Sequence, residues 1–417
     1  MNLLPTRAAV AVFLSFAFAY FFSALLRAIT ATLSPVLSAE FSLNARDLGL
    51  LAGGYFLGFA ATQLPMGTWL DRHGPKKVVL SMLSLAVLGC LAFSAATGFS
   101  WLLAARVLCG VGVSACLMAP LTGYRRWFDP TTQLRANSWM LMTGSFGMVA
   151  STLPVQWLVP IVGWRPLFWL LALLIGVAMA LIAWQVPRWE AVPSAAAEPG
   201  GTVAGAAADG GYAAVWRHPY FRCLVPIGFF SYGGLIAMQT LWAGPWMTHV
   251  TGRTPAQAAQ GLFWINMSML ATFWTWGMVT PRLTRLGLRP EQLIAWGLPS
   301  SFVVLAVLIA AGGAAEPFIT PLFALYCMGC SFVALAQPAV GMAFPSSLAG
   351  RALSAYNLVI FAGVFAVQWG IGLLIDALKA LGMAEVAAYQ GAMSVLLVCG
   401  VASYAYFLWA KPHNQGS

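Results

Sequence analysis

Residues 67–77 read Gly-Thr-Trp-Leu-Asp-Arg-His-Gly-Pro-Lys-Lys, a short charged segment between two long apolar stretches. Gly74 and Pro75 favour a tight turn, because glycine tolerates unusual backbone angles and proline fixes one of them. Asp71 can accept hydrogen bonds from the N-terminus of a neighbouring helix, whose partial positive charge favours a carboxylate. Gly67 allows a second helix to approach closely. The segment therefore predicts a tight basic turn between two packed helices.

The chain on both sides of this turn is far more apolar than a water-soluble protein. Of its 417 residues, 60% are hydrophobic and 8% are charged, and the mean hydropathy is +0.82. Because a soluble chain carries about 25% charged residues, most of this surface must face lipid. Long unbroken apolar runs indicate α-helices, since the strands of a membrane barrel alternate in polarity.

Apolar runs of about 20 residues mark the candidate membrane helices. The first run, residues 8–26, is longer than the core of a cleaved signal peptide, so we expect it to remain as a spanning helix. The sequence predicts an all-α polytopic membrane protein with about twelve transmembrane helices. They are placed near residues 8–33, 47–70, 78–98, 101–123, 136–159, 164–186, 221–246, 256–280, 291–312, 317–341, 351–375 and 386–409.

Basic residues are distributed unequally between the predicted loops. With both termini in the cytoplasm, fifteen lysines and arginines fall in inner loops and four fall in outer loops. This is the positive-inside pattern of a membrane protein, so the net charge of +10 does not indicate nucleic-acid binding. We expect an integral protein of a bacterial cytoplasmic (inner) membrane.

The longest polar stretch divides the predicted helices six and six. It runs from Pro187 to about Pro219 and is rich in Ala, Gly and Pro, which is typical of a flexible linker. The sequence predicts an N-terminal six-helix bundle at 1–190, a cytoplasmic linker at 191–216 and a C-terminal six-helix bundle at 217–417. Halves with the same helix number indicate an internal pseudo-repeat.

Residues 67–77 resemble the loop between helices 2 and 3 of the major facilitator superfamily, whose pattern is Gly-x-x-x-Asp-Arg-x-Gly-x-Lys/Arg-Lys/Arg. A degraded copy that lacks the Asp follows the eighth predicted helix at residues 277–289. Residues 106–112, Arg-Val-Leu-Cys-Gly-Val-Gly, are similar to the family's Arg-x-x-x-Gly-x-Gly pattern in helix 4. Gly163-Trp164-Arg165, before the sixth predicted helix, is another common family feature.

The resemblance implies a secondary transporter with two six-helix halves that rock about a central site by alternating access. It also implies that the turn closes the cytoplasmic side. The gating residues would be Gly67, Asp71, Arg72, Gly74, Lys76 and Lys77. The drug–proton antiporters of this superfamily usually carry a Gly-Pro motif in helix 5, and the predicted helix 136–159 has none. The sugar-porter signatures are also missing.

Two arginines fall inside predicted helices, where a charge is expensive to bury and is therefore a candidate functional residue. They are Arg27 and Arg106. In the fold that the resemblance implies, helices 1, 4, 7 and 10 line the cavity, and two guanidinium groups there favour a carboxylate or phosphate. Two alternatives stay open: Arg27 could extend to the outer interface, and Arg106 could serve packing or conformational coupling.

Acidic side chains are missing from the predicted membrane interior. All eleven Asp and Glu residues fall in loops or near helix ends, and none of the four His is at mid-membrane. A cationic substrate would lack a counter-charge there, so an anionic or neutral substrate is favoured. Coupling could use a proton carried with the substrate, exchange against a counter-anion, or no ion.

Amide side chains on the candidate cavity helices could orient a ligand. The favoured ones are Gln239, Asn266, Gln337 and Asn357. The alternative is that they hydrogen-bond one helix to another. Other polar and aromatic candidates on these helices include Tyr20, Gln63, Tyr232, Trp242, Tyr326 and Gln368.

Gly49, Gly53, Gly54 and Gly58 form overlapping small-x-x-x-small pairs in the second predicted helix. Such pairs allow close backbone approach. Two interpretations of these glycines stay open. They could form a contact along which the two halves slide during transport, or they could serve static helix packing.

The leading hypothesis is a secondary transporter for a small organic anion such as a carboxylate. The alternatives are an efflux pump for amphipathic drugs or metabolites and a membrane sensor that transports nothing. An enzyme is not expected, because there is no acidic cluster for a metal and no nucleophile beside a base. We expect no cofactor and no metal, a small-molecule substrate with H⁺ or a counter-anion, a lipid bilayer as the environment, no nucleic acid, and a monomer.

Overall fold

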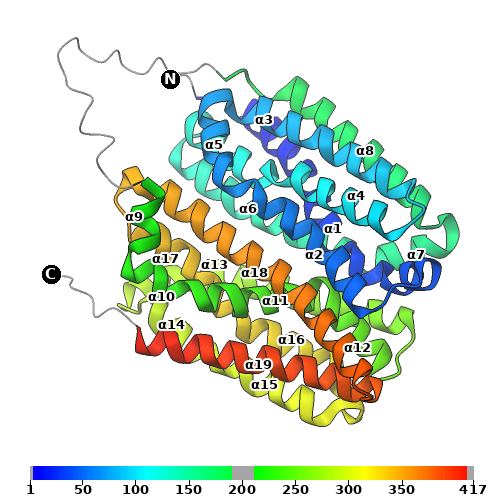
Figure 1. Ribbon diagram of the computed structural model, residues 1–417. Helices are drawn as coiled ribbons and strands as arrows, with labels where there is room; N and C mark the ends of the chain where they lie inside the picture. Colours follow the sequence, from blue (N-terminus) through cyan, green and yellow to red (C-terminus); the bar gives the residue numbers. More distant parts are fainter. Residues whose placement is uncertain (1–2, 190–210, 411–417) are drawn as a thin grey trace.

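The protein is all helical in the residues that its computed structural model describes, 3–189 and 211–410. Figure 1 shows two groups of roughly parallel helices, α1–α8 above and α9–α19 below. The first group is α1 (Thr6–Phe41), α2 (Ala45–Ala61), α3 (Gln63–Ser94), α4 (Phe99–Val113), α5 (Ala115–Trp127), α6 (Pro130–Ala150), α7 (Leu153–Val162) and α8 (Trp164–Gln185).

The second group contains more breaks. Its helices are α9 (Gly211–Arg217), α10 (Pro219–Ile227), α11 (Gly233–Ala237), α12 (Ala243–His249), α13 (Pro255–Arg285), α14 (Pro290–Gly297), α15 (Pro299–Ala311), α16 (Ile319–Cys330), α17 (Ala336–Met342), α18 (Ser346–Ala380) and α19 (Glu385–Trp409). Two π-helical turns, η1 (Gly228–Tyr232) and η2 (Met238–Trp242), interrupt the path from α10 to α12. Two 3₁₀ turns, η3 (Gly312–Phe318) and η4 (Ser331–Leu335), flank α16.

Eight segments of the described chain are long and apolar enough to span a membrane, and the bent pair α6 and α7 makes a ninth. The 17-residue α2 continues into α3 as far as the break at Gly74, so it forms a separate span. The 31-residue α13 is long enough by itself, and the segment Pro290–Met342 is two rods separated at Gly312. Within the described ranges this gives twelve spans, and the expected all-α polytopic fold is confirmed.

Gly74 produces the tight turn that residues 67–77 predict. Its φ of 77° and ψ of 160° lie outside the helical region and break α3 in two. A Cβ at this position would lie 2.2 Å from side-chain atoms of Trp189, so the site requires glycine for both conformation and space.

The basic loops gather at one end of the molecule, which we call the basic end. There the Lys76 Nζ donates to the Val186 carbonyl at 2.7 Å, and the Arg126 guanidinium lies 4.6 Å from the Trp189 ring. Figure 1 places α9 and α14 at this end, and α7 and α12 at the other, which we call the opposite end. The predicted linker 191–216 falls mostly outside the described residues, and residues 211–217 form α9.

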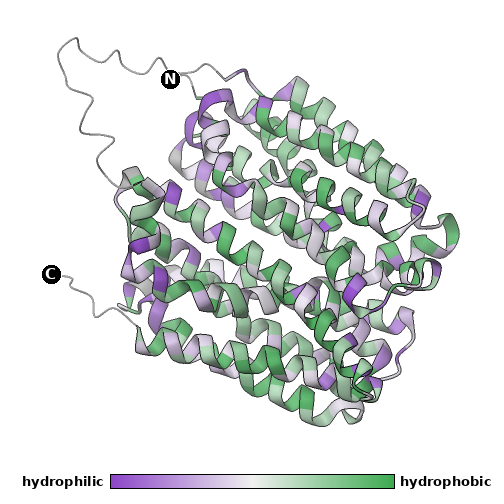
Figure 2. Ribbon diagram, in the orientation of Figure 1, coloured by the Kyte–Doolittle hydropathy of each residue, from purple (hydrophilic) through white to green (hydrophobic). Residues whose placement is uncertain are grey.

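The outer surface of the bundle is apolar along much of its length (Figure 2). Large side chains such as Leu173, Val303 and Val398 are more than 60% exposed. In water such exposure would be costly, whereas in a bilayer it is the expected surface.

Glycines on two faces of α2 bring other helices close. A Cβ on Gly49 would lie 2.4 Å from the Gln368 carbonyl oxygen of α18, in the second half. A Cβ on Gly58 would lie 2.2 Å from the Val107 carbonyl oxygen of α4, in the first half. The same helix therefore packs closely on its own half and on the opposite half, so both readings of the glycine pattern have a structural counterpart.

Candidate functional site

Arg27 lies in the interior of the molecule, on α1, where the two halves meet. Its guanidinium carbon is 5.7 Å from the centre of the Phe59 ring of α2. The side chains of Tyr55, Tyr20 and Tyr232 lie near enough to the guanidinium to influence it electrostatically. Tyr232 belongs to η1 of the second half, so both halves contribute to the surroundings of this one charge.

The charge of Arg27 is not compensated by the protein. None of the acidic residues that the structure describes forms an ion pair with it. Its Nε is buried and has no hydrogen-bond partner. A guanidinium without an acidic partner inside a membrane protein attracts an anion strongly, because opposite charges are screened less there than in bulk water.

Arg106 is fully buried in α4, and its side chain faces the backbone of Arg27 rather than the Arg27 guanidinium. Its Nη2 donates to the backbone carbonyl oxygen of Arg27 at 3.4 Å. Its guanidinium carbon lies 5.1 Å from the centre of the Tyr55 ring. The Tyr55 hydroxyl in turn donates to the Ser23 carbonyl at 3.0 Å. These contacts fit the bracing of α1 against α2 and α4, and substrate binding by Arg106 stays a prediction.

The four predicted amides are joined in two pairs within the second half. Gln239 Nε2 donates to Asn266 Oδ1 at 2.9 Å, which ties η2 to α13. Gln337 Nε2 donates to Asn357 Oδ1 at 2.6 Å, which ties α17 to α18. The contacts are those of the alternative reading, in which the amides connect helices, and ligand binding by them remains untested.

Several aromatic residues at the site were not singled out from the sequence. The Phe361 ring of α18 lies 4.4 Å from the Phe59 ring, and Tyr55 stacks on Phe59 at 6.3 Å. An apolar ring in an apolar helix looks like any core residue, so Tyr55, Phe59 and Phe361 carry no local signal of a site. Only Tyr20 and Tyr232 were among the wider set of candidates.

The predicted gating residues lie at the basic end. Asp71 and Arg72 are exposed, and Asp71 makes no hydrogen bond or ion pair with any residue that the structure describes. The expected close packing at Gly67 is absent, because a Cβ there would meet no atom within 4 Å.

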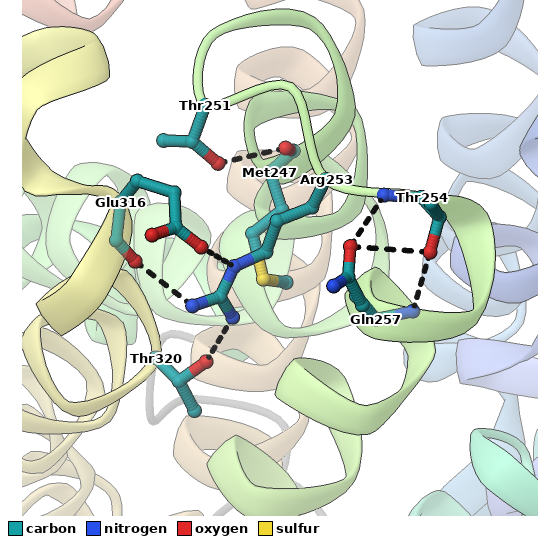
Figure 3. A network of polar contacts seen from close by, with 7 residues as sticks. All are labelled: Met247, Thr251, Arg253, Thr254, Gln257, Glu316 and Thr320. Carbon is teal, nitrogen blue, oxygen red and sulfur yellow. Dashed lines mark hydrogen bonds and ion pairs between the residues drawn. The ribbon is translucent and has the colours of Figure 1, made fainter.

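A polar network at the opposite end fixes loops of the second half (Figure 3). Arg253 donates from Nε to Glu316 Oε1 at 3.1 Å, from Nη2 to the Glu316 carbonyl at 2.8 Å, and from Nη1 to Thr320 Oγ1 at 2.9 Å. Thr251 Oγ1 donates to the Met247 carbonyl at 2.7 Å. Each guanidinium nitrogen of Arg253 donates to the protein and Glu316 balances its charge, so this network is structural, in contrast to Arg27, which has no acidic partner in the described chain.

Two surface hollows flank α1, and Arg27 lines neither of them. The hollow at the basic end lies between the start of α1 and the start of α6 and includes Phe13 and Trp139. The hollow at the opposite end includes Glu40, Trp164 and Pro255. Both hollows lie at the ends of the molecule. The candidate site is therefore assigned from the interior residue Arg27, whose Nε has no hydrogen-bond partner.

A family model described as Major Facilitator Superfamily matches residues 16–368. Among solved structures, a D-xylose-proton symporter matches with a TM-score of 0.78 at 13% identity, covering 98% of this chain and 99% of that one. A bacterial homolog of the human lysosomal transporter Spinster, inward-facing and unoccupied, matches with a TM-score of 0.74 at 16% identity, covering 98% of each chain. At these identities the structures show the fold alone.

Curated relatives match shorter segments. Methyl viologen resistance protein SmvA of Salmonella typhimurium is 30% identical over 157 residues, 37% of this chain and 32% of that protein. The 4-hydroxybenzoate transporter PcaK of Pseudomonas aeruginosa is 25% identical over 156 residues, 37% of this chain and 35% of that protein. Multidrug resistance protein MdtL of Escherichia coli is 27% identical over 157 residues, 36% of this chain and 38% of that protein. The chain thus spans about a third of the length of the curated relatives it matches.

Proposed function

Since this chain belongs to the major facilitator superfamily, we propose that it is a secondary transporter that moves a small organic anion, such as a carboxylate, across the membrane by alternating access. The observation that carries the choice of an anion is Arg27, an interior guanidinium between the halves with no acidic partner in the described chain. A carboxylate would pair with the planar guanidinium through two parallel hydrogen bonds.

The position of Arg27 fits alternating access. Groups from the first half and Tyr232 from the second half surround the same guanidinium. A ligand bound there contacts both halves, and its affinity changes when the halves rock apart. Such differential affinity is what couples a ligand to a conformational equilibrium. The proposed halves are residues 1–190 and 217–417, joined by the linker 191–216, and we propose that they work as a monomer.

We expect transport of the substrate to be coupled to an ion without a proton-relay residue in the protein interior. The acidic residues that the structure describes lie at helix ends, as in the ion pairs of Arg165 with Glu40 and of Lys379 with Glu385. Without an interior carboxylate among them to relay a proton, a proton would travel with the substrate, or a counter-anion would return through the site. The proposed orientation places the basic end in the cytoplasm of a bacterial cell, following the positive-inside pattern.

A ligand-stabilisation screen on the detergent-purified chain tests the anion site. Carboxylates, phosphorylated compounds, sugars and lipophilic cations are compared on the unmodified protein and on Arg27→Gln. A ligand that binds only the folded state raises the unfolding temperature by mass action. We expect stabilisation by carboxylates that Arg27→Gln abolishes. The control Arg285→Gln removes an exposed charge at the basic end and should keep the stabilisation.

Efflux of amphipathic compounds is the second candidate function. The relatives SmvA, a methyl viologen resistance protein, and MdtL, a multidrug resistance protein, support it, as do the aromatic rings near Arg27. An organic cation such as methyl viologen, however, would meet an unpaired positive charge at this site. Stabilisation by lipophilic cations that survives Arg27→Gln would favour efflux and overturn the anion proposal. Ligand binding without flux in proteoliposomes would instead indicate a sensor.

A further inference from the structure

We propose that the Arg27 site selects a monovalent anion carried on a flat aromatic ring. The inference rests on the proposed transport of organic anions and specifies the substrate class of that same site. Three features support it: the single accessible positive charge, the aromatic rings next to the guanidinium, and the hydrogen bonds that already engage the amides of the second half.

A ligand at this site meets one positive charge. The Arg27 side chain is partly accessible, whereas Arg106 is fully buried. Arg106 contacts the Arg27 backbone carbonyl and the Tyr55 ring and has no exposed surface to offer a ligand. A second negative charge on the ligand would have no partner and would lose its hydration. The site is therefore matched to a single negative charge.

Aromatic rings of both halves form a cluster next to that charge. The centre of the Phe59 ring lies 5.7 Å from the Arg27 guanidinium carbon and 4.4 Å from the centre of the Phe361 ring of the second half. Tyr55 stacks on Phe59 with an interplanar angle of 21°. An aromatic ligand gains offset or edge-to-face contacts in such a cluster, which an aliphatic ring of similar size does not make. The geometry thus favours a planar ring over a saturated one.

The amides offer little to a hydroxyl-rich ligand. The Gln239 amide already donates to Asn266, and the Gln337 amide donates to Asn357. Asn266 Nδ2 also donates to the Leu262 carbonyl at 2.9 Å. A polyhydroxylated acid could use only the N–H groups and oxygen lone pairs that these bonds leave over, and each of its hydroxyls without a partner would lose its hydrogen bonds to water. The site is therefore expected to reject sugar acids.

The test measures apparent dissociation constants from the concentration dependence of the unfolding temperature at constant pH. Four acids are compared on the full chain: benzoate, cyclohexanecarboxylate, terephthalate and gluconate. Benzoate is expected to bind about 3- to 10-fold more tightly than cyclohexanecarboxylate, which has the same charge without a π face. Terephthalate, a dianion, and gluconate, a polyol, are expected to bind at least about tenfold more weakly than benzoate.

Two variants separate aromatic recognition from general packing. Phe59→Leu should weaken benzoate binding by about 3- to 10-fold and leave cyclohexanecarboxylate within about twofold. The control Phe168→Leu removes a buried ring of α8 that stacks on Phe93, away from Arg27. It should lower the unfolding temperature of the free protein without changing the ratio of the two affinities.

The outcomes distinguish this inference from the proposed function. Equal affinities for benzoate and cyclohexanecarboxylate, or tight binding of terephthalate or gluconate, would overturn the aromatic monoanion while Arg27-dependent binding kept the anion transporter. Binding of none of the four acids would overturn the aromatic monoanion, and binding that Arg27→Gln leaves unchanged would overturn both proposals.

Discussion

The backbone N–H of Arg46 donates to Asp376 Oδ2 at 2.8 Å, across the interface between the two halves. Arg46 is in the first turn of α2 and Asp376 is near the end of α18, so a carboxylate of the second half satisfies the N-terminus of a first-half helix. Beside it, a Cβ on Gly372 would lie 2.3 Å from the Ala45 carbonyl oxygen, so the two backbones are in close contact. The halves are held together here at the opposite end.

Asp376→Ala is expected to weaken this closure. It removes a carboxylate at a helix N-terminus, an interaction of about 0.5–2 kcal/mol. The conformation open at the opposite end should therefore gain population by about 2- to 30-fold relative to the closed one. Distance distributions between spin labels at Ser100 and Leu381, one on each half, would report the change.

The neighbouring Lys379→Ala is the control for that measurement. Lys379 lies on the same helix but pairs with Glu385 inside the second half. It should leave the distances between the labels as they are. An unchanged distribution in Asp376→Ala as well would show that the Arg46–Asp376 contact does not hold the halves closed.

Substitutions on the two faces of α2 should have different effects. Gly49→Ala presses on the α18 backbone and should alter the equilibrium between conformations, because the halves must separate to admit a methyl group. Gly58→Ala presses on α4 within the first half and should lower stability by about 1–3 kcal/mol through overpacking.

Thermal unfolding and proteoliposome uptake measure these two effects separately, and Gly67→Ala is the matched control for stability. A methyl group at Gly67 meets no atom within 4 Å, and alanine favours a helix more than glycine does, so this variant should keep or slightly raise the unfolding temperature. If Gly49→Ala and Gly58→Ala gave identical losses of stability and uptake, the distinction between a face toward the other half and a static face would be wrong.

Asp71→Asn should impair transport more than ligand binding. The exposed Asp71 has no partner in the described chain, so its replacement should change stability by less than about 0.5 kcal/mol. The gating role implied by the family resemblance requires its carboxylate in another conformation. Uptake in proteoliposomes and ligand affinity in detergent are compared, and unchanged uptake would contradict the latch.

Arg106→Met should reduce uptake without reducing stability. Nε and Nη1 of this fully buried arginine have no hydrogen-bond partner, and replacing a poorly paired buried charge with an apolar side chain is often neutral or stabilising by about 1–4 kcal/mol. A residue kept at such a cost indicates a functional reason, which here is its contact with the backbone of Arg27. An unfolding temperature that falls while uptake stays normal would assign Arg106 to packing alone.

Much of the fold follows from local properties of the chain. The number of spans, the tight turn at Gly74 and the gathering of basic loops at one end were all predicted, since hydropathy, turn chemistry and charge are written in consecutive residues. The choice of Arg27 as a candidate also came from the sequence, because a charge inside an apolar run is conspicuous wherever it occurs.

The partners of these residues were decided only by tertiary structure. That Gln239 donates to Asn266, that Arg106 contacts the backbone carbonyl of Arg27, and that Phe59 packs on Phe361 all depend on which helix lies next to which. Helices of similar apolar character can pack in many arrangements in lipid, and no local pattern marks the one neighbour that each face will have. The sequence by itself determined that a charge lies in the membrane, and the packing of the helices determined that it lies unpaired between the halves, surrounded by aromatic rings.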